Sequence, residues 1–157
     1  MATAFVYNDG GRKSAGYKGQ ARDCVVRAIA IATQQPYEKV RQDLMATTQD
    51  WVDTSRTREA RKQAKEGAST RNGVYRAVYD RYLKSLGWEW TPTMKIGSGC
   101  KVHLRREELP TGRIICSVSK HLVAVVDGII HDTEDPSRDG TRCVYGYWTS
   151  PKREQKL

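Results

Sequence analysis

One cysteine in this sequence stands where a thiol can act as a nucleophile. Cys24 lies in the first turn of an apolar helix predicted over residues 23–33, behind a glycine-rich segment at residues 8–19. Backbone N–H groups and the dipole at a helix N-terminus stabilise a thiolate, which is the reactive form of cysteine. The same N–H groups can bind the oxyanion that forms in acyl transfer. Cys24 is therefore a candidate nucleophile, and the competing interpretation is a small buried side chain in a core helix.

His121 and Asp132 are predicted to meet across a β-hairpin. Asp127-Gly128 stands between two runs rich in β-branched residues, which indicates a two-residue turn. With this turn Asp132 lies opposite Val123, and His121 is its diagonal neighbour on the same face. An aspartate at this position can orient a histidine that acts as a base. The competing interpretation is a solvated histidine at the start of a strand.

The order of these groups resembles that of papain-like cysteine peptidases. In both, a cysteine opens a helix, a histidine opens a strand, and an acid lies on the next strand. The likeness is greatest to compact bacterial forms, such as the peptidase domains of bacteriocin exporters. Residues 8–33 and 121–133 also resemble uncharacterised small proteins of bacteria and their phages.

The resemblance implies a role for each candidate residue. Cys24 would be the nucleophile, His121 the general base and acid, and Asp132 the orienting group. Gln20, near Cys24 in the chain, would complete the oxyanion hole. Asp23 departs from the family pattern, in which the residue before the cysteine is often small or aromatic. Its charge would raise the thiol pKa unless the side chain turns away as a helix cap.

The remaining pattern predicts an α+β domain with N-terminal helices packed on a C-terminal antiparallel sheet. The resemblance implies that this domain is of papain-like type. Helices are predicted over 23–33, 36–47 and 73–86, and strands over 4–7, 88–91, 113–118, 121–126, 129–133 and 143–148. Residues 1–150 are expected to form one domain with a basic insertion at about 51–72, and 151–157 a charged tail.

The chain carries a net charge of +9, which favours an acidic partner. Besides a protein or peptide substrate, this partner would be nucleic acid or an acidic protein. The predicted insertion has little apolar periodicity, and a solvated surface is the competing interpretation. Its candidate binding residues are Arg56, Arg58, Arg61, Lys62 and Lys65.

No cofactor, metal or membrane is expected from the motifs. The sequence has no P-loop, no GxGxxG and no zinc-ligand spacing. It has no apolar run long enough to cross a bilayer and no signal-peptide pattern at its start, so we expect a cytoplasmic protein, in the host cell if a phage encodes it. For the same reason no disulfide is expected among the four cysteines.

Two hypotheses of different class follow. The first is a cysteine hydrolase, most simply a peptidase, that cleaves an amide or isopeptide bond through a thioester at Cys24. Transamidation and deamidation stay open for the same triad. The second is a non-catalytic binding or inhibitor protein that uses a basic surface on a papain-like scaffold.

Overall fold

The structure of the chain, a computed structural model, describes residues 4–19, 22–67, 73–95 and 97–151. Its helices are α1 (Cys24–Thr33), α2 (Tyr37–Thr54), α3 (Arg58–Glu66) and α4 (Arg76–Ser85), with a 3-10 turn η1 (Arg106–Glu108). Its strands are β1 (Phe5–Tyr7), β2 (Glu89–Pro92), β3 (Arg113–Val118), β4 (His121–Val126), β5 (Ile129–Asp132) and β6 (Gly146–Thr149). The α+β class predicted from the sequence is confirmed.

The strands form one six-stranded sheet in the order β1-β5-β4-β3-β6-β2. The inner pairs β5–β4, β4–β3 and β3–β6 are antiparallel, as predicted. At one edge the N-terminal strand β1 pairs parallel to β5, so the C-terminal strands are antiparallel to one another as predicted but the whole sheet is mixed. A hairpin turn imposes an antiparallel pair, but β1 and β5 are separated by most of the chain, so no turn sets their relative direction.

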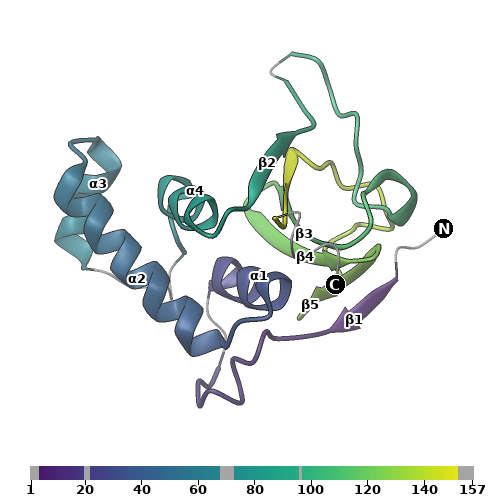
Figure 1. Cartoon of the computed structure of the whole chain (residues 1–157). Helices are drawn as coiled ribbons and strands as arrows, with labels where there is room; N and C mark the ends of the chain where they lie inside the picture. The colour runs from purple at the N-terminus through teal and green to yellow at the C-terminus, as the bar shows by residue number, and fades with distance from the viewer. Residues whose placement is uncertain (1–3, 20–21, 68–72, 96, 152–157) are drawn as a thin grey trace.

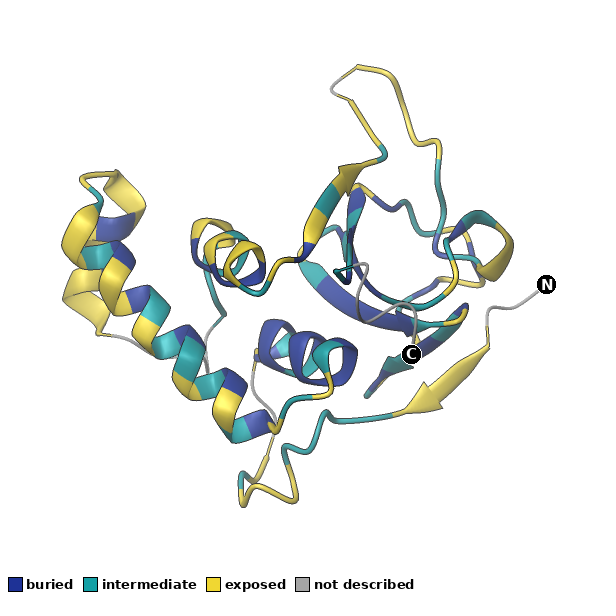
Figure 2. Cartoon of the chain, viewed as in Figure 1, coloured by how far each residue is buried: buried dark blue, intermediate teal, exposed yellow. Residues whose placement is uncertain are grey.

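Helix α1 is apolar on nearly every side because it lies at the centre of the molecule. The sheet covers one of its sides, and α2 and α4 cover others (Figure 1). Val26 and Ile29 of α1 are fully buried, and the helix is among the most buried elements of the fold (Figure 2). Burial of each such side chain contributes about 1.5–3 kcal/mol to folding. The N-terminus of α1 is thereby held in one position against the sheet.

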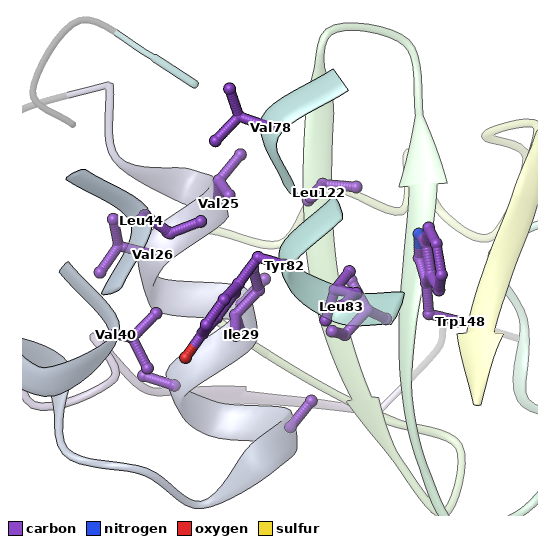
Figure 3. Close-up of a cluster of buried hydrophobic side chains, with 14 of the residues drawn as sticks. Val25, Val26, Ile29, Val40, Leu44, Val78, Tyr82, Leu83, Leu122 and Trp148 are labelled. Atoms are coloured by element: carbon purple, nitrogen blue, oxygen red, sulfur yellow. The ribbon is translucent and has the colours of Figure 1, made fainter. Parts of the chain in front are cut away.

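The cluster around α1 draws side chains from every layer (Figure 3). Helices α2 and α4 contribute one apolar face each, and the sheet contributes the residues that point toward the helices. Those labelled in Figure 3 are Val25, Val26 and Ile29 of α1, Val40 and Leu44 of α2, Val78, Tyr82 and Leu83 of α4, and Leu122 and Trp148 of the sheet. A second cluster contains the alternate strand residues, including Val123, Val125 and Ile130, together with Leu104, Leu109 and Val144.

Helix α2 continues past residue 47, where its end was predicted. Leu44, Thr48 and Trp51 follow helical spacing and are all buried, so Trp51 belongs to the core and not to an exposed insertion. Helix α3 follows after a break and lies against α2 (Figure 1). Residues 68–72, the last part of the predicted insertion, lie outside the described residues. Within the described ranges, no helix has the length and apolar character that crossing a bilayer requires.

Cys100 and Cys143 form a disulfide, and the expectation of no disulfide is therefore wrong. The two cysteines are 43 residues apart, and no sequence motif marks them as a pair. The backbone N–H of Val144 donates to the carbonyl oxygen of Val102, and His103 and Cys143 form an isolated β-bridge, so the two segments lie side by side. The tertiary pairing of these loops, and not a local motif, brings the two sulfur atoms together.

Reduction of this disulfide is expected to destabilise the fold. Closing a loop of 43 residues restricts the unfolded chain, which corresponds to about 4 kcal/mol in the chain-entropy model. The paired variant Cys100→Ser/Cys143→Ser should lower the denaturant midpoint by an amount close to that produced by a reductant on the native chain. Cys116→Ser, at a buried free cysteine, is the control: the reductant should lower its midpoint by the same amount as that of the native chain, because the disulfide is intact in both. An unchanged midpoint in the paired variant would contradict the prediction.

Candidate active site

Cys24 is the first residue of α1, and its side chain is half-buried at the end of the sheet. Its sulfur accepts a hydrogen bond from the backbone N–H of Leu122, and the thiol is also hydrogen-bonded to the side chain of His121. Both partners belong to the start of β4. The packing of α1 on the sheet thus brings together two residues that are 97 positions apart in the sequence (121 − 24).

The hairpin that carries His121 and Asp132 has the predicted register. Asp127 and Gly128 both adopt positive φ, as the predicted two-residue turn requires, and Val126 pairs with Ile129. His121 Nε2 lies 2.6 Å from Asp132 Oδ2, so the predicted contact between the two side chains is confirmed. Because this bond occupies Nε2, the ring nitrogen left for the Cys24 sulfur is Nδ1.

Arg27 connects the acid of this hairpin to α1. Its Nη1 lies 3.1 Å from Asp132 Oδ1 and donates to Thr133 Oγ1 at 2.7 Å. The backbone N–H of Thr133 also donates to Asp132 Oδ1, at 2.7 Å. Asp132 is only 6% exposed, so these donors replace the water that its carboxylate would otherwise bind. Arg27 therefore holds Asp132 in the orientation from which it meets His121.

Asp23 does not cap α1, contrary to the expectation, although it is the residue before the first turn. Its carboxylate is turned away and buried. Oδ2 lies 3.3 Å from Arg12 Nη1 and accepts a hydrogen bond from Tyr37 Oη at 2.5 Å, and Oδ1 lies 3.0 Å from Arg27 Nε. Two guanidinium groups neutralise the charge that would otherwise raise the pKa of the neighbouring thiol.

The glycine-rich segment before Cys24 approaches α1 closely at Gly10. Gly10 has φ of 71°, and a Cβ atom there would lie 3.0 Å from the carbonyl oxygen of Arg27. Only glycine combines this backbone conformation with so close an approach. The segment then presents Arg12 to Asp23, so its local geometry supports the charge pairing behind the cysteine.

The environment of Cys24 and His121 favours the charged form of both. Burial raises the pKa of the Cys24 thiol, but the hydrogen bonds from His121 and Leu122 and the charges of His121 and Arg27 outweigh it, and the net pKa lies below the ordinary value. Burial lowers the pKa of His121, whereas its bonds to Asp132 and Cys24 raise it to about 9 overall. The arrangement therefore shifts the proton equilibrium toward a thiolate–imidazolium pair. Burial alone raises the pKa of Cys116, which leaves that thiol inert.

The titration of His121 gives a direct test of this electrostatic arrangement. The chain has three histidines, so their ring protons can be followed individually by NMR. His121 is expected to titrate near pH 9, whereas burial and the charge of Arg113 hold the pKa of His131 below 6.5. Because the folded pKa of His121 exceeds its ordinary value of 6.5, its charged form stabilises the fold fully below pH 6.5, and this contribution is lost as the pH rises through 9. Asp132→Asn should lower the His121 pKa by about one unit or more, and an unchanged pKa would contradict the arrangement.

Two cavities meet at His121. One, of about 740 Å³, is a groove that exposes Cys24 and is bounded by α4 and the β3–β4 turn; we call it the Cys24 groove. The other, of about 1010 Å³, lies on the side of the glycine-rich segment and the loop after β5. His121, Lys120 and Arg27 line both. These three residues form the boundary that the two cavities share.

Tyr79 and Arg142 belong to the site but carry no sequence signal. Tyr79 of α4 lines the Cys24 groove, where burial, the charge of Asp80 and the proximity of Cys24 raise its pKa to about 12, so its hydroxyl stays protonated. Arg142 donates to the carbonyl oxygen of Ser119 at 2.6 Å and so holds the turn that precedes His121. Tyr79 follows the helical spacing of a core residue, and Arg142 lies in a loop, so neither stands out in the sequence.

The other residues predicted to be functional lie away from the Cys24 cluster or outside the described residues. Gln20, the predicted oxyanion-hole residue, lies outside the described residues. The basic candidates Arg56, Arg58, Arg61, Lys62 and Lys65 are all exposed, on α3 and the segment before it. His131 contacts Asn8 Nδ2 at 3.2 Å and is not part of the Cys24 cluster. No group of three metal-ligating side chains was found in the part of the chain that the structure describes.

Comparison with known proteins identifies no relative of this chain. No protein-family model, no curated protein and no solved structure matches it. The chemistry of the site must therefore be argued from its own geometry.

Proposed function

We propose that this protein is a cysteine hydrolase, most simply a peptidase, that acts through Cys24, His121 and Asp132 in a papain-like arrangement. The observation that carries the proposal is the hydrogen-bonded chain from the Cys24 thiol through His121 to Asp132, with 2.6 Å between His121 Nε2 and Asp132 Oδ2. A nucleophile, a base and an orienting acid in this order are what acyl transfer requires. A buried structural cysteine needs neither a histidine nor a lowered pKa.

The first half-reaction follows from the charged pair. The Cys24 thiolate attacks the carbonyl carbon of an amide, and the carbonyl π electrons move to oxygen. The His121 imidazolium then transfers the proton of Nδ1 to the amide nitrogen as the C–N bond breaks. An amine leaves, and the acyl group stays on sulfur as a thioester.

The second half-reaction restores the enzyme. Neutral His121 takes a proton from water, whose oxygen attacks the thioester carbon, and the C–S bond breaks to release a carboxylic acid and the thiolate. Asp132 stabilises the imidazolium in both half-reactions without taking its proton. If an amine replaces water the outcome is transamidation, and if the substrate is a side-chain carboxamide the outcome is deamidation.

Alkylation by iodoacetamide tests the proposed nucleophile. At pH 6–7 Cys24 is expected to react much faster than free cysteine, because a larger fraction of it is thiolate and thiolate is the nucleophile. Mass spectrometry of the alkylated peptides identifies the residue, and buried Cys116 is the internal control. If Cys24 reacts no faster than free cysteine, the thiolate on which the proposal depends is absent.

Tyr79 is expected to act as a donor to the oxyanion. Its hydroxyl lines the Cys24 groove and, within the described residues, has no hydrogen-bond partner. A donor aimed at the developing charge contributes about 10²-fold to kcat. Tyr79→Phe should therefore lower kcat by about that factor with little change in KM. Tyr75→Phe on the preceding turn is the matched control. A change in KM alone would assign Tyr79 to substrate binding.

A second candidate function is non-catalytic binding of an acidic partner through the basic surface of α3. This helix buries Ala60 and Gln63 and leaves its basic side chains in solvent. Cys24→Ala separates the two functions, because it should abolish hydrolysis and leave binding intact. Charge reversal at Arg58, Arg61 and Lys62 should abolish binding of the acidic partner and leave hydrolysis intact.

A further inference from the structure

The Cys24 groove has a pronounced bias of charge. Four basic side chains line it, and no Asp or Glu occurs among its described lining residues. The basic side chains are Arg22, Arg27, Arg76 and Lys120. The neighbouring cavity differs, because Asp9, Glu134 and Asp135 line it alongside basic residues. The described lining of the groove at the nucleophile thus carries basic side chains and no carboxylates.

Two of the four cations have internal partners. Arg27 is committed to Asp23 and Asp132 and is largely buried. Arg76 lies 3.3 Å from Asp80 and stacks over the Trp90 ring at 4.9 Å. The charge of these two groups is therefore partly compensated by the protein itself.

Arg22 and Lys120 are exposed, and within the described residues neither has a partner. Both lie next to the reacting groups: Arg22 is two residues before Cys24, and Lys120 directly precedes His121. A negative group on a bound molecule would meet these two side chains close to the bond under attack. Opposed charges at such a site also increase the rate at which the molecule is captured.

We infer that the substrate is an acidic peptide segment, with Asp or Glu side chains beside the scissile amide bound by Arg22 and Lys120. The inference rests on the proposed function. Peptide is favoured over nucleic acid, because a cysteine, a histidine base and an orienting acid in this order are the groups that acyl transfer requires. The apolar part of the groove wall is mostly aliphatic, with Val25, Val74 and Val118, and Tyr79 is the only Phe, Tyr or Trp among its described lining residues. Single-stranded nucleic acid needs a series of stacking surfaces.

Chloroacetyl dipeptide amides test the inference, because the thiolate displaces chloride and forms a stable thioether. Three probes share one backbone and carry Glu-Glu, Gln-Gln or Lys-Lys after the chloroacetyl group; Glu and Gln have the same shape and differ in charge, and Lys reverses the charge. Rates of Cys24 alkylation are followed by mass spectrometry of the intact protein at pH 7. The Glu-Glu probe is expected to react about fivefold or more faster than Gln-Gln, and the Lys-Lys probe more slowly than both. Salt at about 0.5 M should reduce the difference.

Charge reversal assigns the preference to the two residues. In Arg22→Glu/Lys120→Glu the order of the three probes should invert, whereas Lys84→Glu, an exposed lysine of α4 outside the groove lining, should keep the native order. Rapid alkylation with equal rates for the three probes overturns the acidic substrate and leaves the proposed nucleophile standing. Alkylation no faster than that of free cysteine contradicts both. Protection of Cys24 by a short oligonucleotide, without preference for Glu-Glu, assigns the groove to nucleic acid instead and overturns the inference.

Discussion

Replacement of His121 by asparagine is expected to lower the rate of amide hydrolysis by about 10³- to 10⁴-fold. Asparagine cannot protonate the leaving amine, and it removes the positive charge that favours the Cys24 thiolate. Without the hydrogen bond from His121, which lowers the pKa of the thiol, burial raises that pKa. The rate of Cys24 alkylation by iodoacetamide at pH 6–7 should fall together with hydrolysis, which links the two losses to one cause.

His131→Asn is the matched control for this substitution. His131 is on β5, one residue before Asp132, and its side chain contacts that of Asn8. The His131→Asn substitution should therefore leave the alkylation rate of Cys24 close to that of the native protein. A His121→Asn variant that keeps the native hydrolysis rate would remove His121 from the mechanism.

Replacement of Arg27 by methionine is expected to cost about 3–5 kcal/mol of folding free energy, the range for breaking a buried ion pair by removing one partner. Arg27 bridges Asp23 and Asp132, which are 2% and 6% exposed. Without the Arg27 guanidinium, Asp132 loses its ion-pair partner on α1, and Asp23 keeps Arg12 as its cationic partner and Tyr37 as a hydrogen-bond donor. Thermal or denaturant unfolding measures the loss, which for a chain of this length corresponds to a fall in Tm of about 10 °C.

Arg81→Met provides the control, because Arg81 pairs with Asp50 at 3.1 Å but both side chains are well exposed. A surface pair of this kind contributes at most about 1 kcal/mol. Arg27→Lys keeps the charge but cannot contact both carboxylates in the same bidentate way, so its loss should be intermediate. If Arg27→Met and Arg81→Met unfold alike, Arg27 does not join α1 to the hairpin as described.

The local chemistry of the two halves of the site could be predicted from the sequence. An apolar run of helical spacing located the helix that Cys24 begins, and Asp127-Gly128 set the register of the hairpin. Because alternation in a hairpin follows from its turn, the contact of His121 with Asp132 followed as well. The basic composition of the chain was also evident, but not which basic residues line the Cys24 groove.

The tertiary structure alone decided how the halves meet. Alternation assigns His121 to the row of Val123 and Val125, which belong to a different core cluster from the one around α1. The contact with Cys24 arises only because His121 stands at the end of the sheet, beside the N-terminus of α1. Other features of the structure also depend on contacts between segments distant in the chain. They are the contact of Arg27 with Asp132, that of Arg142 with Ser119, the position of Tyr79 in the Cys24 groove, the pairing of Asp23 with Arg12 and the Cys100–Cys143 disulfide. Spacing and turn residues act over a few positions. The sequence by itself therefore determined most of the elements and the pair within one hairpin, whereas packing decided the contacts between elements.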